Sequence, residues 1–209
     1  MKPSCKRLFI VSVLMIFFGE VSCNCQCNLK LSKQRHFYYS NKNYLDSLNI
    51  KYPDFKEINC ELRIWYSKLI TGQNKFFQIK MMKDSSWVCN AIEFYYYNSS
   101  SHNFKETKAE KIKLKDEWYT IWSKIVQNDY LNLTTQRDDK IKTSDNEVLL
   151  IGDGEVYTFE ILTKKIKRNF SYSNPYDYYK YYLNKGIKVA EYESITSFID
   201  LLKEVLNFE

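Results

Sequence analysis

The chain has 209 residues, 44% of them hydrophobic and 17% aromatic, and a formal net charge of +6. This length fits one ordinary domain with a sizeable core, and only 5 Gly and 3 Pro argue against a linker or a repeat array. No catalytic, cofactor or metal-binding signature is present. The sequence therefore indicates compartment and fold more than activity.

The first residues have the pattern of a secretory leader. Lys2, Lys6 and Arg7 precede an apolar run at residues 8–18, which is too short to span a bilayer comfortably. We expect residues 1–23 to be a signal peptide. The mature protein would then lie in the periplasm, on the outer membrane surface or in the medium.

Two routes of leader removal are open. Val21-Ser22-Cys23 partly resembles a bacterial lipobox, in which Cys23 would be lipidated and would become the new N-terminus. Glu20 stands where that box normally has Leu or another aliphatic residue. The alternative is ordinary signal peptidase cleaving near Cys23. A lipid on Cys23 is the only membrane attachment that the sequence predicts.

Four cysteines remain for disulfide chemistry on either route, and these are Cys25, Cys27, Cys60 and Cys89. An even number in an exported chain favours disulfides, with three connectivities to choose from. Cys60 and Cys89 fall in segments that we predict to be strands of one sheet, so this pair is the first expectation. Cys25-x-Cys27 lacks the spacing and the nearby histidines of a zinc site, so no metal is predicted.

Residues 24–57 have no sustained period, and we expect an N-terminal arm with a short helix near residues 44–48. Residues 58–209 then form a single domain. Its first half alternates polar and apolar side chains in three segments, which predicts strands near 60–66, 77–81 and 87–97. An amphipathic helix at about residues 115–128 follows, with Trp118 and Trp122 on its apolar side.

The second half repeats this order. Residues 148–151 predict a strand, Asp153-Gly154 a hairpin turn, and residues 156–161 and 166–172 two further strands. Helices follow from Pro175 and over residues 195–206. We therefore expect an α+β fold: an antiparallel sheet of two three-stranded meanders, with about three helices packed on one face.

The entry to the first of these helices carries several local signals. Asn174 can cap the helix, Pro175 suits its first position, and Asp177 would complete a capping box. The helix then carries five tyrosines. We consider Tyr176, Tyr179 and Tyr182 as an exposed binding surface. Half-buried packing with the hydroxyl groups at the surface is the alternative.

The ending of the chain resembles a set of small exported proteins and lipoproteins of Bacteroidota. The shared pattern is Asp153-Gly154, the run Phe170-Ser171-Tyr172-Ser173-Asn174-Pro175 and the upstream helix with Trp118. The resemblance covers roughly residues 62–209. That family is uncharacterised, so the resemblance implies origin and compartment, and it supplies no catalytic residues.

Our leading hypothesis is a non-enzymatic domain that binds a protein or a glycan of the cell envelope. The rival is a hydrolase or inhibitor-like domain with a dispersed site, which predicts a cleft with two carboxylates, or with His36 or His102. Gly152-Asp153-Gly154 lacks the lysine and the following helix of a phosphate loop. The lysines are dispersed, so nucleic acid is a minor alternative that would require steep salt dependence.

Overall fold

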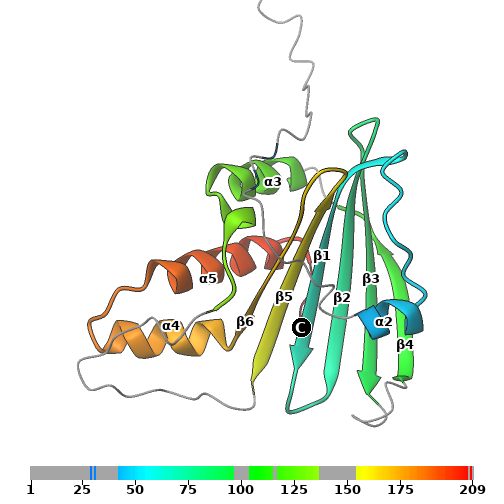
Figure 1. Ribbon diagram of the computed structural model, residues 1–209. Coiled ribbons are helices and arrows are strands. Elements are labelled where there is room, and N and C mark those ends of the chain that lie inside the picture. Colours follow the sequence, from blue (N-terminus) through cyan, green and yellow to red (C-terminus); the bar gives the residue numbers. More distant parts are fainter. Residues whose placement is uncertain are drawn as a thin grey trace, which may run out of the picture.

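A six-stranded antiparallel sheet with helices on one face forms the protein (Figure 1). The computed structural model describes residues 29, 31, 42–96, 104–114, 117–136, 154–206 and 208. The strand order is β4-β3-β2-β1-β5-β6. The strands are β1 Ile58–Lys68, β2 Gln73–Met82, β3 Trp87–Tyr96, β4 Phe104–Ile112, β5 Glu155–Thr163 and β6 Lys167–Ser173. The helices are α2 Lys42–Ser47, α3 Trp118–Gln127, the 3-10 turn η1 Tyr130–Asn132, α4 Pro175–Asn184 and α5 Ala190–Lys203. The predicted α+β class is confirmed.

The strands divide differently from the two predicted meanders of three. β1 to β4 form one meander of four strands, and β5 and β6 form a hairpin that joins it beside β1. β4 has no apolar alternation, and the sequence around Lys108 and Lys111 is charged. Charged side chains are typical of edge strands, which have a neighbouring strand on one side only. The predicted strand at residues 148–151 lies outside the described residues.

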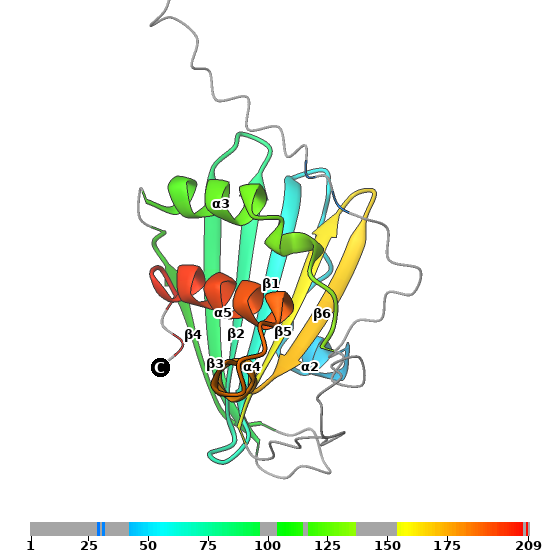
Figure 2. The same cartoon turned by 90° about the vertical axis from the view of Figure 1, so that its left-hand side faces the viewer.

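The main core lies between the sheet and three helices. α3, α4 and α5 all cover the same face of the sheet (Figure 2). Alternate strand residues such as Leu62 and Phe159 are buried against Phe198 of α5, and Trp118 and Trp122 of α3 face the sheet as predicted. Leu29 and Leu31 of the predicted N-terminal arm pack against this core.

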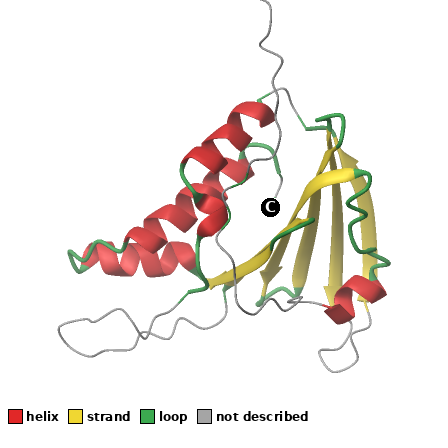
Figure 3. Ribbon diagram, turned by 45° about the horizontal axis from the view of Figure 1, so that its top comes forward, coloured by secondary structure: helices red, strands yellow, loops and turns green. Residues whose placement is uncertain are grey.

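The other face of the sheet carries a smaller cover. α2 lies on the side away from the three helices (Figure 3), and residues 48–57 continue from it toward β1. A second, smaller apolar cluster holds this cover on the sheet, and it consists of Leu45, Trp65, Phe76 and Phe94. Because β1 is covered on both faces, its polar as well as its apolar side chains are buried.

The predicted Cys60–Cys89 disulfide is wrong. Cys60 pairs with Met81 of β2, and Cys89 pairs with Ile79 of the same strand, so β2 separates the two cysteines. Strands in a sheet are about 4.8 Å apart, which places β1 and β3 about 9.6 Å apart. A disulfide needs Cα atoms within about 7 Å. Both side chains are buried thiols. Cys23, Cys25 and Cys27 lie outside the described residues.

We expect burial in the fold to protect Cys60 and Cys89 from alkylating reagents. Burial raises the pKa of Cys89 to about 12, so its reactive thiolate is scarce at neutral pH. Iodoacetamide should leave both cysteines unmodified in the native protein. In denaturant it should modify Cys89 without any reductant, as measured by peptide mass spectrometry. A requirement for prior reduction would contradict the structure.

The predicted capping box is also absent. Asn174 precedes α4 and Pro175 starts it as expected, but the Asn174 side chain does not cap the helix. Asn174 has φ 47° and ψ 46°, in the left-handed region that asparagine tolerates. Its Oδ1 atom instead accepts the backbone N–H of Glu155 at 2.7 Å. This side chain therefore ties the start of β5 to the end of β6.

Candidate functional site

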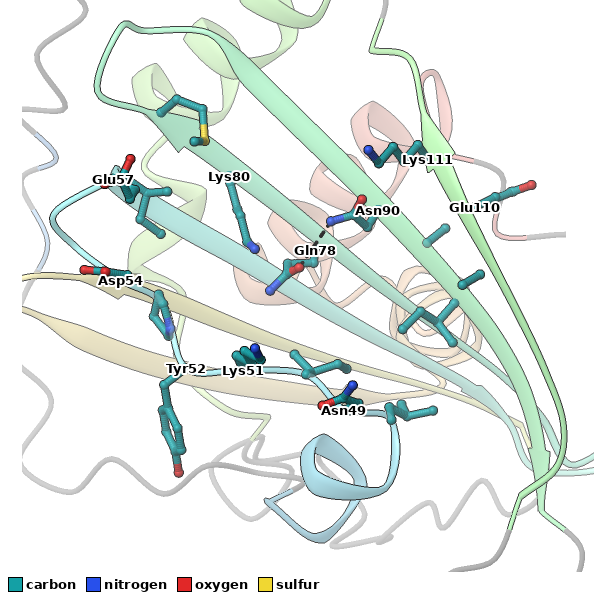
Figure 4. Close-up of a pocket in the computed structure, with 18 residues that line it drawn as sticks. Asn49, Lys51, Tyr52, Asp54, Glu57, Gln78, Lys80, Asn90, Glu110 and Lys111 are labelled. Atoms are coloured by element: carbon teal, nitrogen blue, oxygen red, sulfur yellow. Dashed lines mark hydrogen bonds between the residues drawn. The ribbon is translucent and has the colours of Figure 1, made fainter.

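A groove of about 710 Å³ lies on the face of the sheet away from α3, α4 and α5 (Figure 4). One wall is the segment 48–58, and the floor is formed by β2, β3 and β4. The residues that line it are Leu48, Asn49, Ile50, Lys51, Tyr52, Pro53, Asp54, Glu57, Ile58, Gln78, Lys80, Met82, Asn90, Ala91, Ile92, Ala109, Glu110 and Lys111. We call this the sheet groove.

The wall segment is held in place by hydrogen bonds at both ends. The Ile50 N–H donates to the Leu45 carbonyl at 2.8 Å, which closes the end of α2. The Ile58 N–H donates to the Asp54 carbonyl at 3.2 Å, where the chain turns into β1. Between them, Nη2 of Arg63 donates to the Lys51 carbonyl at 3.0 Å. A side chain of β1 thus holds the middle of the wall segment against the sheet.

One polar row crosses all six strands on the groove face. The strand register aligns Lys111, Asn90, Gln78, Arg63, Glu160 and Asn169, one from each strand from β4 to β6. Side chains opposite one another in a sheet interact directly. Asn90 Nδ2 donates to Gln78 Oε1 at 3.3 Å, and Gln78 Nε2 donates to Glu61 Oε1 at 2.9 Å. This row orients the amides of the groove floor.

Arg63 and Glu160 of this row form a buried group of charges with Glu61, which lies two residues before Arg63 on β1. The side chains of Glu61, Arg63 and Glu160 are all 0% exposed. Arg63 Nε donates to Glu61 Oε1 at 2.5 Å, and its Nη1 lies 3.7 Å from Glu160 Oε2. Buried carboxylates depend on such a partner, because a lone charge in the interior is strongly destabilising. Arg63 therefore compensates the buried charges of Glu61 and Glu160 and also binds the wall at Lys51.

Three lysines surround the polar floor. Lys51, Lys80 and Lys111 come from the wall, β2 and β4, respectively. In the part of the chain that the structure describes, none of their ammonium groups lies within 4.0 Å of a carboxylate. Of the acidic lining residues, Glu110 points away from the groove in Figure 4 and lies 3.9 Å from Lys108. The middle of the sheet groove is therefore basic.

The tyrosines that we considered as a binding surface do not form one. Tyr182 is 4% exposed and stacks on Tyr192 of α5, with ring centroids 5.7 Å apart. Tyr176 donates its hydroxyl to Asp200 Oδ1 at 2.5 Å, and Tyr179 packs half-buried against the core. The prediction failed because α4 packs on α5 through this side, and half-buried packing was the correct alternative.

A second polar cluster joins β1 to β5. The hydroxyls of Tyr66 and Tyr157 donate to the two carboxylate oxygens of Glu155, at 2.8 and 2.7 Å. Burial and the bond to this carboxylate raise the pKa of Tyr157 above its ordinary value. The hydroxyl stays protonated and both carboxylate oxygens are occupied. The cluster therefore acts as a structural clamp at the end of the strand pair.

The remaining sequence candidates cannot be placed. Gly152, Asp153, His36 and His102 lie outside the described residues, as does the predicted leader. Among the residues that the structure does describe, no three His, Cys, Asp or Glu side chains are grouped to hold a metal ion. No helix in this part combines the length and the apolar character needed to cross a bilayer.

Comparison with protein-family models and with curated proteins finds no match. The resemblance to exported proteins of Bacteroidota therefore stays a prediction. The functional argument depends on the geometry of the sheet groove.

The sequence reasoning missed the sheet groove, although a signal for it existed. Gln78, Lys80 and Asn90 are polar side chains at alternate positions of β2 and β3, on the face opposite the apolar core. Each strand alone looks like an ordinary half-solvated strand. Only the register and the placement of residues 48–58 make the three positions into one floor.

Proposed function

We propose that this protein is an exported, non-enzymatic binding domain that holds a protein or glycan of the cell envelope in the sheet groove. The observation that carries the proposal is the groove itself, about 710 Å³ in volume, whose lining combines aliphatic side chains with oriented amides and with lysines that have no described carboxylate partner. Binding sites typically combine a mostly apolar concave surface of this size with a few fixed polar groups.

The positions of the carboxylates support binding over hydrolysis. Acid–base catalysis needs two groups that converge on one substrate atom. In Figure 4, Asp54 and Glu57 lie together at one end of the groove, and Glu110 points away at the other. The Asp54 carboxylate accepts the backbone N–H of Lys56 at 2.9 Å, so it serves the local turn. Glu110 therefore cannot act on the same substrate atom as Asp54 or Glu57.

The experiment is a screen of the purified protein against a displayed peptide library and a glycan array. The groove is blocked with Asn90→Trp, which places a large ring on the floor. The matched control is Tyr119→Trp, on the exposed side of α3, where Tyr119 is 49% exposed. Ligands enriched by the unchanged protein should lose at least about tenfold in affinity with Asn90→Trp and should be unaffected by Tyr119→Trp.

Circular dichroism and thermal unfolding would show that both variants fold. Binding that is equal in both variants would place the ligand elsewhere on the surface. Absence of any groove-dependent ligand from both libraries would refute the proposed function.

A further inference from the structure

We infer that the occupant of the sheet groove is an extended, acidic segment of a partner protein. This inference rests on the proposed function and adds the chemistry of the ligand. It is carried by the charge of the groove, by the nature of its walls and by the edge of the sheet that borders it.

Away from Asp54 and Glu57, which lie at one end, the charge of the groove favours an anion. Lys51, Lys80 and Lys111 bring three ammonium groups to the groove, and no described carboxylate pairs with any of them. Lys80 lies opposite Glu61 in the register, but the Glu61 carboxylate is fully buried and is already bound by Arg63 and Gln78. A ligand carboxylate can therefore meet ammonium groups that have no competing partner. Complementary charge of this kind also speeds encounter and excludes basic ligands.

The lining favours a peptide over a sugar. Saccharides are typically bound by stacking on aromatic rings. Tyr52 is the only aromatic residue among the described residues that line the groove, and its ring points away from the floor in Figure 4. The apolar lining is aliphatic instead, with Ile50, Ile58 and Ile92 among its members. Aliphatic pockets beside amide groups suit alternate side chains and backbone groups of an extended chain.

The border of the groove offers a strand edge. Ala109 and Lys111 of β4 line the groove, and no other strand of the described chain pairs with the outer edge of β4. The opposite edge is different: the Gln136 N–H donates to the Ser171 carbonyl at 3.0 Å, and Arg168 donates to two carbonyls of η1 and its flank. Residues 131–136 thus cover β6, while no described strand covers the outer edge of β4.

These features together define the ligand. A peptide added along β4 would turn every second side chain toward the groove face, because side chains alternate along a strand. Acidic residues at those positions would meet Lys111 on the neighbouring strand, while backbone groups would bond to β4. The amide of Asn90 keeps its Oδ1 and one N–H for the ligand, since only the other N–H is used by Gln78.

The probe is a fluorescent eight-residue peptide of alternating Glu and Val, and binding is followed by fluorescence anisotropy. Its two controls are a Lys-Val peptide of the same length and a Glu-Val peptide with alternate backbone nitrogens methylated. We expect the Glu-Val peptide alone to bind, and its affinity to fall as the ionic strength is raised. The methylated peptide should not bind, because it cannot complete the strand pairing.

The charge test uses a matched pair of variants. Lys80→Glu with Lys111→Glu should weaken binding of the Glu-Val peptide by at least about tenfold, since it replaces attraction by repulsion. Lys124→Glu with Lys164→Glu changes the net charge equally at exposed positions away from the groove and should leave binding unchanged.

Three results would overturn the inference. Equal weakening by both variant pairs would show a general charge effect. Equal binding of the methylated peptide would exclude strand addition, and equally tight, groove-dependent binding of an anionic polysaccharide such as hyaluronate would exclude selectivity for peptide. If the library screen still found a groove-dependent ligand of another class, the proposed function would stand and only the inference of an acidic peptide ligand would be refuted. If no ligand depended on the groove, both would fail.

Discussion

Replacement of Arg63 by methionine is expected to lower the free energy of unfolding by about 3–5 kcal/mol, because it leaves two buried carboxylates without their cation. Arg63 lies between Glu61 and Glu160, all three are fully buried, and the Arg63 head group also holds the Lys51 carbonyl. Methionine keeps the aliphatic part of the side chain, so the loss comes mainly from the missing guanidinium group. Urea unfolding followed by circular dichroism would measure it.

Two further variants separate this cause from a general effect of strand β1. Lys68→Met, at the exposed end of the same strand, should change the stability by less than about 0.5 kcal/mol. Adding Glu61→Gln to Arg63→Met should recover part of the loss, because it removes one of the stranded charges. If the double variant were less stable by the full sum of the two single changes, Glu61 and Arg63 would not be coupled.

Gly154→Ala is expected to destabilise the protein by about 2–4 kcal/mol, from overpacking and the loss of a hydrogen bond. A Cβ atom at this position would lie 1.5 Å from Oδ1 of Asn174. That side chain is buried and accepts the Glu155 N–H, so it cannot move aside without breaking the link between β5 and β6. A lower Tm in thermal unfolding, by about 2–4 °C for each kcal/mol, would report the loss.

The control for Gly154 is Gly186→Ala. Gly186 has φ +71° with open space around it, so alanine there meets only backbone strain of about 1–2 kcal/mol. Asn174→Gly keeps the left-handed backbone available and removes the obstructing side chain. Gly154→Ala should therefore cost less in the Asn174→Gly background than alone. An equal cost in both backgrounds would show that the Asn174 side chain is not the obstacle.

Much of the fold could be predicted because it is encoded locally. The alternation of Leu62, Ile64 and Tyr66 predicted β1, and the strands β2, β3, β5 and β6 were found in the same way. The spacing of Trp118 and Trp122 predicted α3, and Pro175 marked the start of α4. β4 was missed because an edge strand carries charges in place of an apolar stripe.

The candidate site could not be predicted in this way. Its polar row depends on a register that sets Asn90 beside Gln78 and Gln78 beside Arg63, across three strands. The same register separates Cys60 from Cys89, which local reasoning had paired.

The sequence by itself therefore determined the class of the fold and most of its elements, because periodicity and turn chemistry act between neighbours in the chain. Only the tertiary structure decided which face of each element is covered. The packing of α4 on α5 buries Tyr182, and the cover from residues 42–57 turns Glu61 and Arg63 from surface positions into buried ones. Such burial depends on contacts between residues far apart in the chain, which no local pattern records.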